Sequence, residues 1–232
     1  MNDNATGPEI MPIPFGAMSL TRTLIAIPIK PFGVAKRRLA PILDSEARSR
    51  VGKAVGAHVT AAALATGCPV AVLTADDGVA GWARDQGASV IDEPGLGLNE
   101  AAGAALTTAR RDQRPWMILH ADLPALTTAD LLTALEMLPE RGVVLAPSHN
   151  GGTSLIAADL DRFPFAYGRA SFRRHLTSAV PFPHRVLIRS GLAIDLDDPL
   201  DLKTAMRLPA GRWLEQLISN HPDQPGPPGV PH

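Results

Sequence analysis

Short apolar runs alternate with longer stretches of helical spacing along the first two thirds of this chain. The apolar runs are rich in β-branched and aliphatic residues, as buried strands are, and lie at residues 23–29, 70–74, 88–91 and 116–120. The helical stretches lie at residues 44–66, 76–86, 98–111 and 128–138. Strands and helices that alternate in this way form right-handed βαβ units. The alternation therefore predicts an α/β fold with a mostly parallel central sheet flanked by helices.

The predicted elements become shorter in the last third of the chain. Further strands are expected at residues 143–146, 155–158, 185–189 and 192–196. Asp198 and Pro199 then begin a last helix, because Asp suits the cap position and Pro the first helical position. No internal repeat divides the chain, so a single domain accounts for all these elements.

The prolines separate this domain from two tails. Residues 1–22 hold three of the 22 prolines and residues 222–232 hold five. We expect a flexible N-terminal tail at 1–22, the folded domain at 23–210, and a C-terminal extension at 211–232 with a Pro-rich flexible end. The N-terminus lacks a cationic segment followed by an apolar run, and no uninterrupted stretch of about 18 apolar residues occurs. A cytoplasmic location without a membrane partner is therefore expected.

Charge balance and missing motifs exclude several classes of protein. The 22 Lys and Arg residues face 23 Asp and Glu residues, so no global positive field favours nucleic acid. Cys68 is the one cysteine, which excludes a disulfide framework or a Cys-based zinc site within the chain. The phosphate-loop, dinucleotide-binding, hydrolase-elbow and zinc-protease motifs are absent. Common NTPases, dinucleotide oxidoreductases, α/β-hydrolases and zinc proteases are therefore disfavoured.

Three carboxylates stand at the ends of predicted strands. Asp122 directly follows an apolar run, and Asp195 and Asp197 are two residues apart, so in a strand they would share one face. Ligands of open α/β sheets bind at the carboxyl ends of the strands. Carboxylates that converge there need a cation between them, and hard oxygen ligands suit Mg²⁺ with a bound phosphate. The alternative is that Asp122 caps a turn and the other two begin the last helix.

A group of cations follows the first predicted strand: Lys30, Lys36, Arg37 and Arg38. Lys supplies a point charge and Arg can bind two phosphate oxygens, while backbone amides near Gly33 add donors. The group therefore suits a triphosphate, although a loop of this kind can also be simply solvated.

Two polar, Gly-containing turns form a third group, at residues 150–154 and 167–171. Hydroxyl groups and bare amides in such turns suit a carboxylate or a phosphate, and ordinary turns are the alternative. Asn99, at the start of a helix after Gly97, is a candidate contact to a base or ribose.

Short motifs in this order and spacing resemble the CofC/FbiD family between about Leu24 and Met206. The motifs are Ile27-Pro28-Ile29-Lys30, Ala35-Lys36-Arg37-Arg38-Leu39, Gly97-Leu98-Asn99, Ala121-Asp122-Leu123-Pro124, Gly152-Thr153, Gly168 to Phe172, and Gly191 to Asp197. The resemblance implies a GT-A-like nucleotidyltransferase fold. It also implies a guanylyltransferase of coenzyme F-420 biosynthesis, which joins the GMP part of GTP to a three-carbon phospho-acid and releases pyrophosphate. The acid is 2-phospho-L-lactate, phosphoenolpyruvate or 3-phospho-D-glycerate.

The resemblance also assigns roles to individual residues. Lys30, Lys36 and Arg38 would be catalytic and meet the nucleotide phosphates, with Asn99 as a further nucleotide contact. Asp122, Asp195 and Asp197 would bind Mg²⁺, with Asp122 also catalytic. Thr153, Gly168 and Ser171 would hold the carboxylate end of the phospho-acid. The resemblance leaves the oligomeric state open, with a homodimer as one option, and allows hand-over of the product to the next enzyme of the pathway.

The chain departs from the family pattern mainly near the acid. Gly168-Arg169-Ala170-Ser171 stands where Gly-Pro-Gly-Ser is common, so a second glycine that allows positive φ is missing and a cation is added. Ser154 replaces a common Asn, and Arg37 a usual Ser or Thr. The sequence around Asp122 and after Ser171 resembles that of bacterial members of the family. This favours phosphoenolpyruvate or 3-phospho-D-glycerate as the acid, with a slight preference for the latter.

Two other functions fit the same residues less well. One is another nucleotidyltransferase of this fold, serving molybdenum cofactor or sugar nucleotides, but such enzymes commonly have a Gly-rich loop where this chain offers Gly33. The other is a catalytically silent nucleotide-binding or scaffold domain that uses its Pro-rich tails for partners, against which the three aspartates argue.

Overall fold

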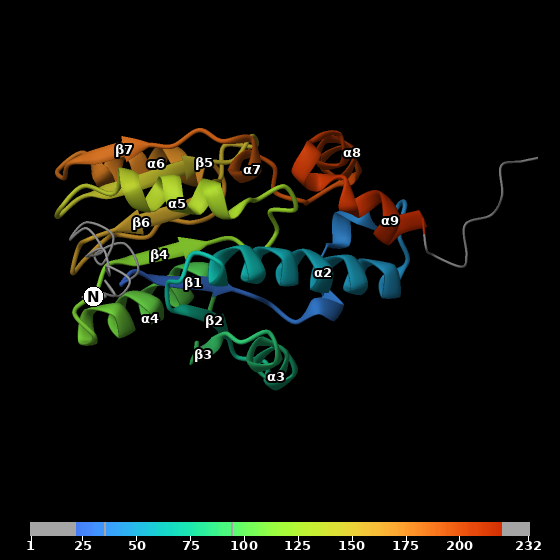
Figure 1. Cartoon of the computed structure of the whole chain (residues 1–232), viewed down its shortest axis with the longest axis horizontal. Coiled ribbons are helices and arrows are strands. Elements are labelled where there is room, and N and C mark those ends of the chain that lie inside the picture. Colours follow the sequence, from blue (N-terminus) through green and yellow to red (C-terminus); the bar gives the residue numbers. More distant parts are fainter. Residues whose placement is uncertain (1–21, 35, 94, 220–232) are drawn as a thin grey trace, which may run out of the picture.

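The fold is an α/β sandwich built on one seven-stranded sheet (Figure 1). The structure, a computed structural model, describes residues 22–34, 36–93 and 95–219, so most of both predicted tails lies outside the described residues. The strands are β1 (Leu24–Pro28), β2 (Val70–Thr74), β3 (Ser89–Asp92), β4 (Trp116–Leu119), β5 (Val143–Pro147), β6 (Thr153–Ala158) and β7 (His184–Val186). Their order is β3-β2-β1-β4-β6-β5-β7, and β6 alone runs antiparallel to its neighbours. The predicted mostly parallel α/β sheet is thus confirmed.

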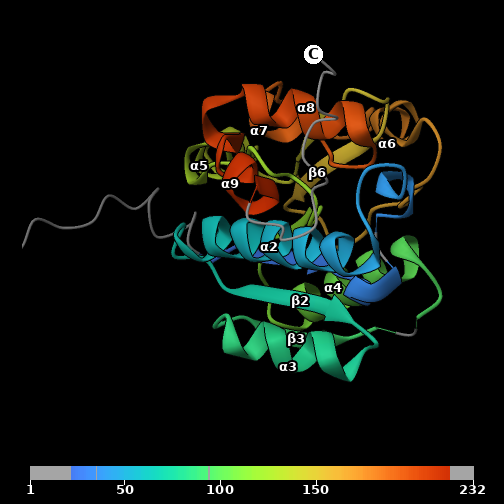
Figure 2. The same ribbon diagram turned by 90° about the vertical axis from the view of Figure 1, so that its right-hand side faces the viewer.

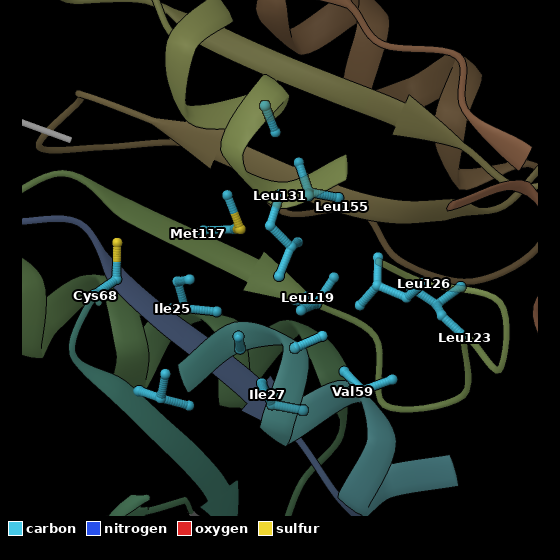
Figure 3. Packing of buried hydrophobic residues seen from close by; sticks show 14 of the residues in the cluster. Ile25, Ile27, Val59, Cys68, Met117, Leu119, Leu123, Leu126, Leu131 and Leu155 are labelled. Atoms are coloured by element: carbon cyan, nitrogen blue, oxygen red, sulfur yellow. The ribbon is translucent and has the colours of Figure 1, made fainter. Parts of the chain in front are cut away.

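Helices cover both faces of the sheet. They are α2 (Ser45–Leu64), α3 (Asp77–Asp85), α4 (Leu98–Arg111), α5 (Thr128–Met137), α6 (Ser171–Ala179), α7 (Ser190–Ala193), α8 (Pro199–Arg207) and α9 (Trp213–Ser219), with short 3-10 turns at Phe32–Val34, Arg37–Leu39 and Pro209–Gly211. On one face, α2 and α5 pack on apolar side chains of β1 and β4 such as Ile25, Ile27, Met117 and Leu119 (Figure 3). α3 extends the same cluster beside β2 and β3. On the other face, α4 and α6 cover a second cluster. No helix of the described ranges is long and apolar enough to cross a membrane.

Side-chain caps fix where the helices begin. Asp44 Oδ1 accepts a hydrogen bond from Ala47 N at 2.7 Å, which stabilises the start of α2. Thr127 and Asp130 form a reciprocal capping box at α5, and Asp198 and Asp201 form one at α8. The predicted cap at Asp198 is therefore confirmed, and it orients the segment that enters α8.

The predicted strand at residues 192–196 is wrong. Its first residues belong to the helical turn α7, and the following residues run in extended conformation outside the sheet. Leu192 is fully buried, and a side chain at Gly191 would collide with the Ala125 carbonyl and Asp130. This close packing under α5 requires a turn at Gly191 that the local apolar pattern does not reveal. The other late strand, predicted at 185–189, is shorter and runs over His184–Val186.

The first part of the predicted C-terminal extension packs on the domain. Leu214 of α9 is fully buried in a cluster shared with α2 and α8. Trp213 donates from Nε1 to the carbonyl of Pro124 at 2.9 Å and stacks on His58. Figure 2 shows α9 lying over α2. These contacts tie the chain end to the loop that follows Asp122.

Candidate functional site

A cavity of about 740 Å³ opens at the carboxyl ends of β1, β2 and β4. This is the position at which open α/β sheets bind ligands. The side chains of Lys30, Lys36, Asp122 and Asp197 line it, as does the Gly-containing loop 95–98. The fold thus brings two of the predicted cations and two of the predicted carboxylates to one cavity.

Lys36 and Asp122 form an ion pair inside this cavity. Lys36 Nζ lies 2.9 Å from Asp122 Oδ2, and the two side chains are only 10% and 26% exposed. Burial alone would raise the pKa of Asp122, but the Lys36 ammonium outweighs it, with help from His120, and holds that pKa below its usual range. Asp122 is therefore ionised and its charge available at neutral pH.

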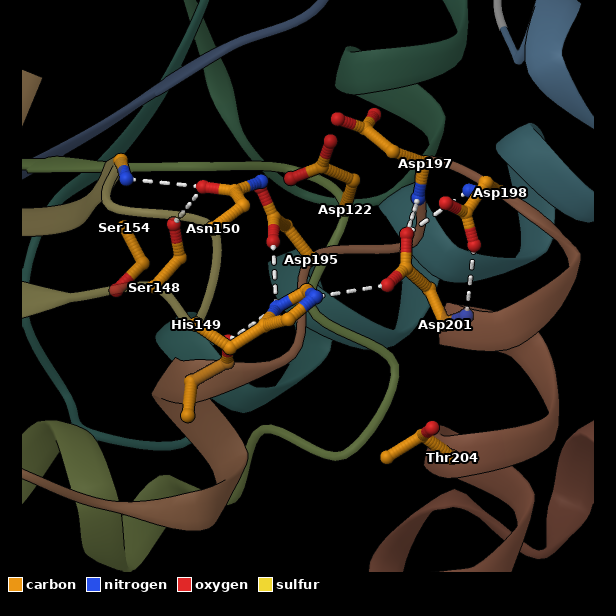
Figure 4. Close-up of polar contacts among 12 residues, drawn as sticks. Asp122, Ser148, His149, Asn150, Ser154, Asp195, Asp197, Asp198, Asp201 and Thr204 are labelled. Carbon is orange, nitrogen blue, oxygen red and sulfur yellow. Dashed lines mark hydrogen bonds and ion pairs between the residues drawn. The ribbon is translucent and has the colours of Figure 1, made fainter. Parts of the chain in front are cut away.

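The two later aspartates converge on Asp122 despite lying outside the sheet. The backbone N–H of Leu196 donates to the Asp122 carbonyl at 2.8 Å, which brings the residues on either side of it to the end of β4. Burial, followed by the charge of Asp122, raises the pKa values of Asp195 and Asp197. Figure 4 shows the three carboxylates as neighbours. The structure thus brings the three predicted carboxylates together, although residues 192–196 do not form the expected strand.

This group of carboxylates has the chemistry of a cation site. Asp122 Oδ1 and Asp195 Oδ1 are buried without a hydrogen-bond partner in the described chain, and unpaired buried oxygens are costly. As the side chains lie, however, no three His, Cys, Asp or Glu residues of the described ranges form a ready metal cage. Lys36 supplies the counter-charge to Asp122 in this arrangement. The carboxylate oxygens of Asp122 and Asp195 are therefore suitable ligands for a hard cation such as Mg²⁺.

A second layer of side chains, which the sequence did not reveal as such, holds Asp195. Asn150 Nδ2 donates to Asp195 Oδ2 at 2.8 Å, while His149 lies between Asp195 Oδ1 (3.4 Å) and Asp201 Oδ1 (3.0 Å) (Figure 4). Asp201 is the partner of the N-cap Asp198 in the capping box of α8. The capping pattern Asp198-Pro199-Leu200-Asp201 was the available signal, but it indicated only a helix start. Asn150, predicted as part of an anion-binding turn, here orients a carboxylate.

Of the remaining predicted cations, the lining of the cavity includes Lys30 but not Arg37 or Arg38. Lys30 is exposed and lines it, and Arg38 is exposed with Nη1 3.8 Å from Asp197 Oδ2. Lys36 adopts the left-handed conformation (φ 59°, ψ 36°), which is uncommon for a residue with a side chain. That conformation directs its ammonium inward, whereas its neighbours Arg37 and Arg38 remain exposed.

The predicted acid-binding residues meet in a separate buried cluster. Thr153 Oγ1 lies 3.1 Å from Ser171 Oγ and 2.9 Å from His175 Nδ1, and all three residues are almost completely buried. Gly168 lies three residues before Ser171 and accepts from its backbone N–H, with φ at +117°. None of these residues lines the cavity of Lys36 and Asp122. The structure thus brings together Thr153, Gly168 and Ser171, which the resemblance assigns to one substrate end, and adds His175, for which the sequence analysis had no signal.

Two aromatic side chains connect the cavity with this cluster. The His120 ring, which lines the cavity, lies 5.5 Å from the Tyr167 ring, and Tyr167 lies 4.7 Å from His175. Both the Tyr167 hydroxyl and His120 Nε2 are buried without a hydrogen-bond partner among the described residues. Asn99, the predicted nucleotide contact, instead accepts from Tyr167 N at 2.7 Å and does not line the cavity. Two buried polar atoms without hydrogen-bond partners, the Tyr167 hydroxyl and His120 Nε2, therefore lie between the cavity and the predicted acid-binding cluster.

Solved structures with a similar fold include transferases of nucleotides and of nucleotide sugars. A protein from Desulfovibrio desulfuricans, provisionally described as a nucleotide-diphospho-sugar transferase, superposes with a TM-score of 0.69 at 16% identity, covering 85% of this chain and 96% of that one. A nucleotidyl transferase from Methanothermobacter thermautotrophicus gives a TM-score of 0.53 at 14% identity, covering 87% and 99%. At such identities the likeness establishes the fold alone.

Sequence relatives are more specific. A phosphoenolpyruvate guanylyltransferase from Sphaerobacter thermophilus is 35% identical over 188 residues, which cover 78% of this chain and 91% of that protein. A 2-phospho-L-lactate guanylyltransferase from Methanothermobacter thermautotrophicus is 29% identical, covering 68% of this chain and 71% of its own. The family model described as "Guanylyl transferase CofC like" matches residues 23–211, nearly the whole described domain. The chain therefore belongs to the CofC-like guanylyl transferase family.

Proposed function

We propose that this guanylyltransferase uses GTP and a three-carbon phospho-acid, and that it serves coenzyme F-420 biosynthesis by passing its product to the next enzyme of that pathway. The observation that carries the proposal is the placement of the Lys36–Asp122 pair, with Asp195 and Asp197 beside it, at the strand ends of a nucleotidyltransferase fold. The names of the relatives support both the nucleotide and the acid.

The reaction needs no general base in this site. An anionic phosphate oxygen of the acid attacks the α-phosphorus of GTP, a new P–O bond forms, and the bond to the β-phosphate oxygen breaks to release pyrophosphate. Lys30, Lys36 and Arg38 neutralise the charge that develops on the leaving pyrophosphate. Catalysis then consists of positioning the two anions and stabilising the charge between them.

Asp122, Asp195 and Asp197 would hold Mg²⁺. When bound, the ion offsets the negative charge of the triphosphate and of the carboxylates themselves. Its support is that Asp122 Oδ1 and Asp195 Oδ1 are buried and accept no hydrogen bond from the described residues, although a histidine ring lies 4.0 Å and 3.4 Å from them. Asn150 and His149 keep Asp195 in place for this role, as outer-layer hydrogen bonds commonly do for metal ligands.

The carboxylate of the acid would lie against Thr153, Ser171 and the backbone of Gly168. α6 begins at Ser171 without a side-chain cap, since Ala170 has no acceptor, and helix N-termini favour anions. Arg169 is exposed and makes no ion pair with the described residues, so the added cation of this turn does not close the acid site in this arrangement.

The acid to test first is phosphoenolpyruvate, because most of the similar named relatives carry that substrate in their names. Purified protein with Mg²⁺ and GTP is supplied with phosphoenolpyruvate, 3-phospho-D-glycerate or 2-phospho-L-lactate, separately and in competition, and pyrophosphate release is measured. We expect release with at least one acid and little with CTP or ATP in place of GTP. Absence of pyrophosphate with every acid would instead support a silent nucleotide-binding domain, and release with a sugar phosphate another transferase.

A further inference from the structure

His175 is hydrogen-bonded to the hydroxyl group of Thr153, which in turn contacts that of Ser171. It lies one turn after Ser171 in α6, so both side chains project from one face of the helix. Both ring nitrogens are engaged: Ala166 N lies 2.8 Å from Nε2, and Thr153 Oγ1 lies 2.9 Å from Nδ1. A backbone N–H can only donate, so Nε2 must be the acceptor. The proton of the neutral ring is therefore on Nδ1 and is donated to Thr153.

This direction leaves one hydroxyl proton without an acceptor. Thr153 Oγ1 accepts from His175, so its own proton is free to donate, and Ser171 Oγ at 3.1 Å is the partner in reach. Whichever of the two hydroxyls donates to the other, one O–H proton finds no acceptor in the described chain. The cluster is thus a net donor, and buried donors need an acceptor. An anionic oxygen supplies one.

A β-bulge brings Thr153 to this cluster. Ala146 of β5 pairs with Leu155, but Pro147 pairs with Thr153, so Ser154 is an extra residue in β6. The side chains of Leu155 and Ala157 face the α2 side of the sheet, and regular alternation would place Thr153 there too. The bulge reverses its direction toward His175 on the other face, an effect for which bulges recur near active sites.

We infer that His175 is a positioning residue that, through its Nδ1 proton, makes Thr153 and Ser171 hydrogen-bond donors toward the carboxylate of the phospho-acid. This inference rests on the proposed function. Burial, together with the nearby Arg174 and His120, lowers the pKa of His175 to about 4, so the ring stays neutral and keeps its lone pair on Nε2. The unpartnered Tyr167 hydroxyl, on the ring beside His175, marks the same region as one that lacks a polar partner.

Two isosteric substitutions separate the two ring nitrogens. In His175→Asn the amide nitrogen takes the position of Nδ1 and still donates to Thr153, whereas in His175→Gln the terminal amide takes the position of Nε2 and leaves Thr153 without its donor. With phosphoenolpyruvate as the probe, we expect His175→Gln to raise the KM for the acid about tenfold and His175→Asn about threefold or less. Neither should change the KM for GTP, and kcat at saturating acid should stay within about twofold.

Controls exclude a merely structural effect. Thr153→Val already removes the hydroxyl that accepts from His175. The double variant Thr153→Val, His175→Gln should therefore bind the acid no more weakly than Thr153→Val alone. His58→Gln alters a different histidine, whose Nε2 contacts the backbone carbonyl of Leu126 outside the acid cluster, and should leave the KM for the acid unchanged. ¹⁵N NMR of the folded protein should show His175 protonated at Nδ1.

Three results would overturn the inference: the Nε2-protonated tautomer, equal KM changes in the Asn and Gln variants, or additive losses in the double variant. Failure of the proposed function is distinct, since the unsubstituted protein would then transfer GMP to none of the acids. In that case the NMR tautomer and a titration of phosphoenolpyruvate followed on the Thr153 amide still test the donor role, and no perturbation there would refute it.

Discussion

The ammonium of Lys36 lies 2.9 Å from the carboxylate of Asp122, across 86 residues of sequence. The pair joins the loop after β1 to the loop after β4, and Lys36 reaches it only from a left-handed backbone conformation. Strained backbone of this kind persists where the surrounding structure requires it, commonly at functional sites. Substitutions of these two residues therefore test the candidate site directly.

Asp122→Asn should lower kcat by several orders of magnitude because it removes a proposed Mg²⁺ ligand. Lys36→Met should lower kcat by about 10²–10³-fold because it removes a positive charge from the reacting phosphates. Circular dichroism should show an unchanged fold, and pyrophosphate release gives the rate. Lys203→Met, which removes an exposed cation of α8, serves as the control and should keep full activity. Full turnover of GTP by Asp122→Asn would exclude the proposed site.

Mg²⁺ should raise the melting temperature of the protein, because a ligand of the native state alone stabilises it by mass action. Asp195→Asn should lose most of that shift. Asp159→Asn is the matched control. Asp159 follows β6, which runs antiparallel to β4, so it lies at the amino ends of the parallel strands, opposite the candidate site. Equal Mg²⁺ shifts in all three proteins, measured by thermal unfolding, would contradict a metal site at Asp195.

Without metal, Asp197→Asn should raise the melting temperature. Burial and the charges of Asp122 and Asp195 raise the pKa of Asp197, so its ionised form disfavours the native state at neutral pH. The amide removes that repulsion. The gain should shrink as the pH falls toward the range in which Asp197 becomes protonated, and a gain that is independent of pH would point to another cause.

Stability should fall on acidification partly through His175. The pKa of its buried ring is about 4 in the native protein against 6.5 in the unfolded chain, so the unfolded state binds more protons between these values. The resulting contribution is complete above about pH 6.5 and lost as the pH falls to 4, up to about 3 kcal/mol. Denaturant unfolding of His175→Asn should show a correspondingly flatter slope over this window, whereas the exposed His184→Asn should keep the slope of the parent protein.

Ala170→Gly should stabilise the protein. Ala170 precedes α6 with φ at +52°, a left-handed conformation that costs a residue with a Cβ about 1 kcal/mol or more and glycine very little. We expect a rise in melting temperature of about 2–4 °C, as about 1 kcal/mol gives in a domain of this size. Ser178→Gly, in the last turn of α6, should act in the opposite direction, because glycine lowers helix stability there.

The sequence predicted the elements that carry strong periodicity. β1, β2 and β4 and the helices α2 to α5 follow from apolar spacing and caps, because each signal is contained within one segment. α7 was missed because Leu192-Ala193-Ile194 is apolar enough for a strand. The turn is indicated only by the close packing of Gly191 on the Ala125 carbonyl, which leaves no room for a side chain at residue 191. Local pattern cannot report such a long-range packing constraint.

The same distinction applies to the site. Asp122, Asp195 and Asp197 were predicted together because their residue types and positions fit one chemistry, and the structure places them together. His175 and His149 were not predicted to act, since their roles depend on which atoms face them across the fold: Ala166 N for one, Asp195 and Asp201 for the other. The bulge at Ser154 likewise has no signal in its own segment.

The hydrogen bond from Leu196 to the end of β4 has a consequence for biosynthesis of the chain. It joins residues 74 positions apart, so the carboxylate group cannot assemble until α7 and the segment after it have been synthesised. A nascent chain that ends just before residue 190 already contains β1 to β7 and the Lys36–Asp122 pair, but neither Asp195 nor Asp197. Guanylyl-transfer activity should therefore appear only after the chain has been synthesised past Asp197, and products that terminate before this residue should be inactive toward GTP.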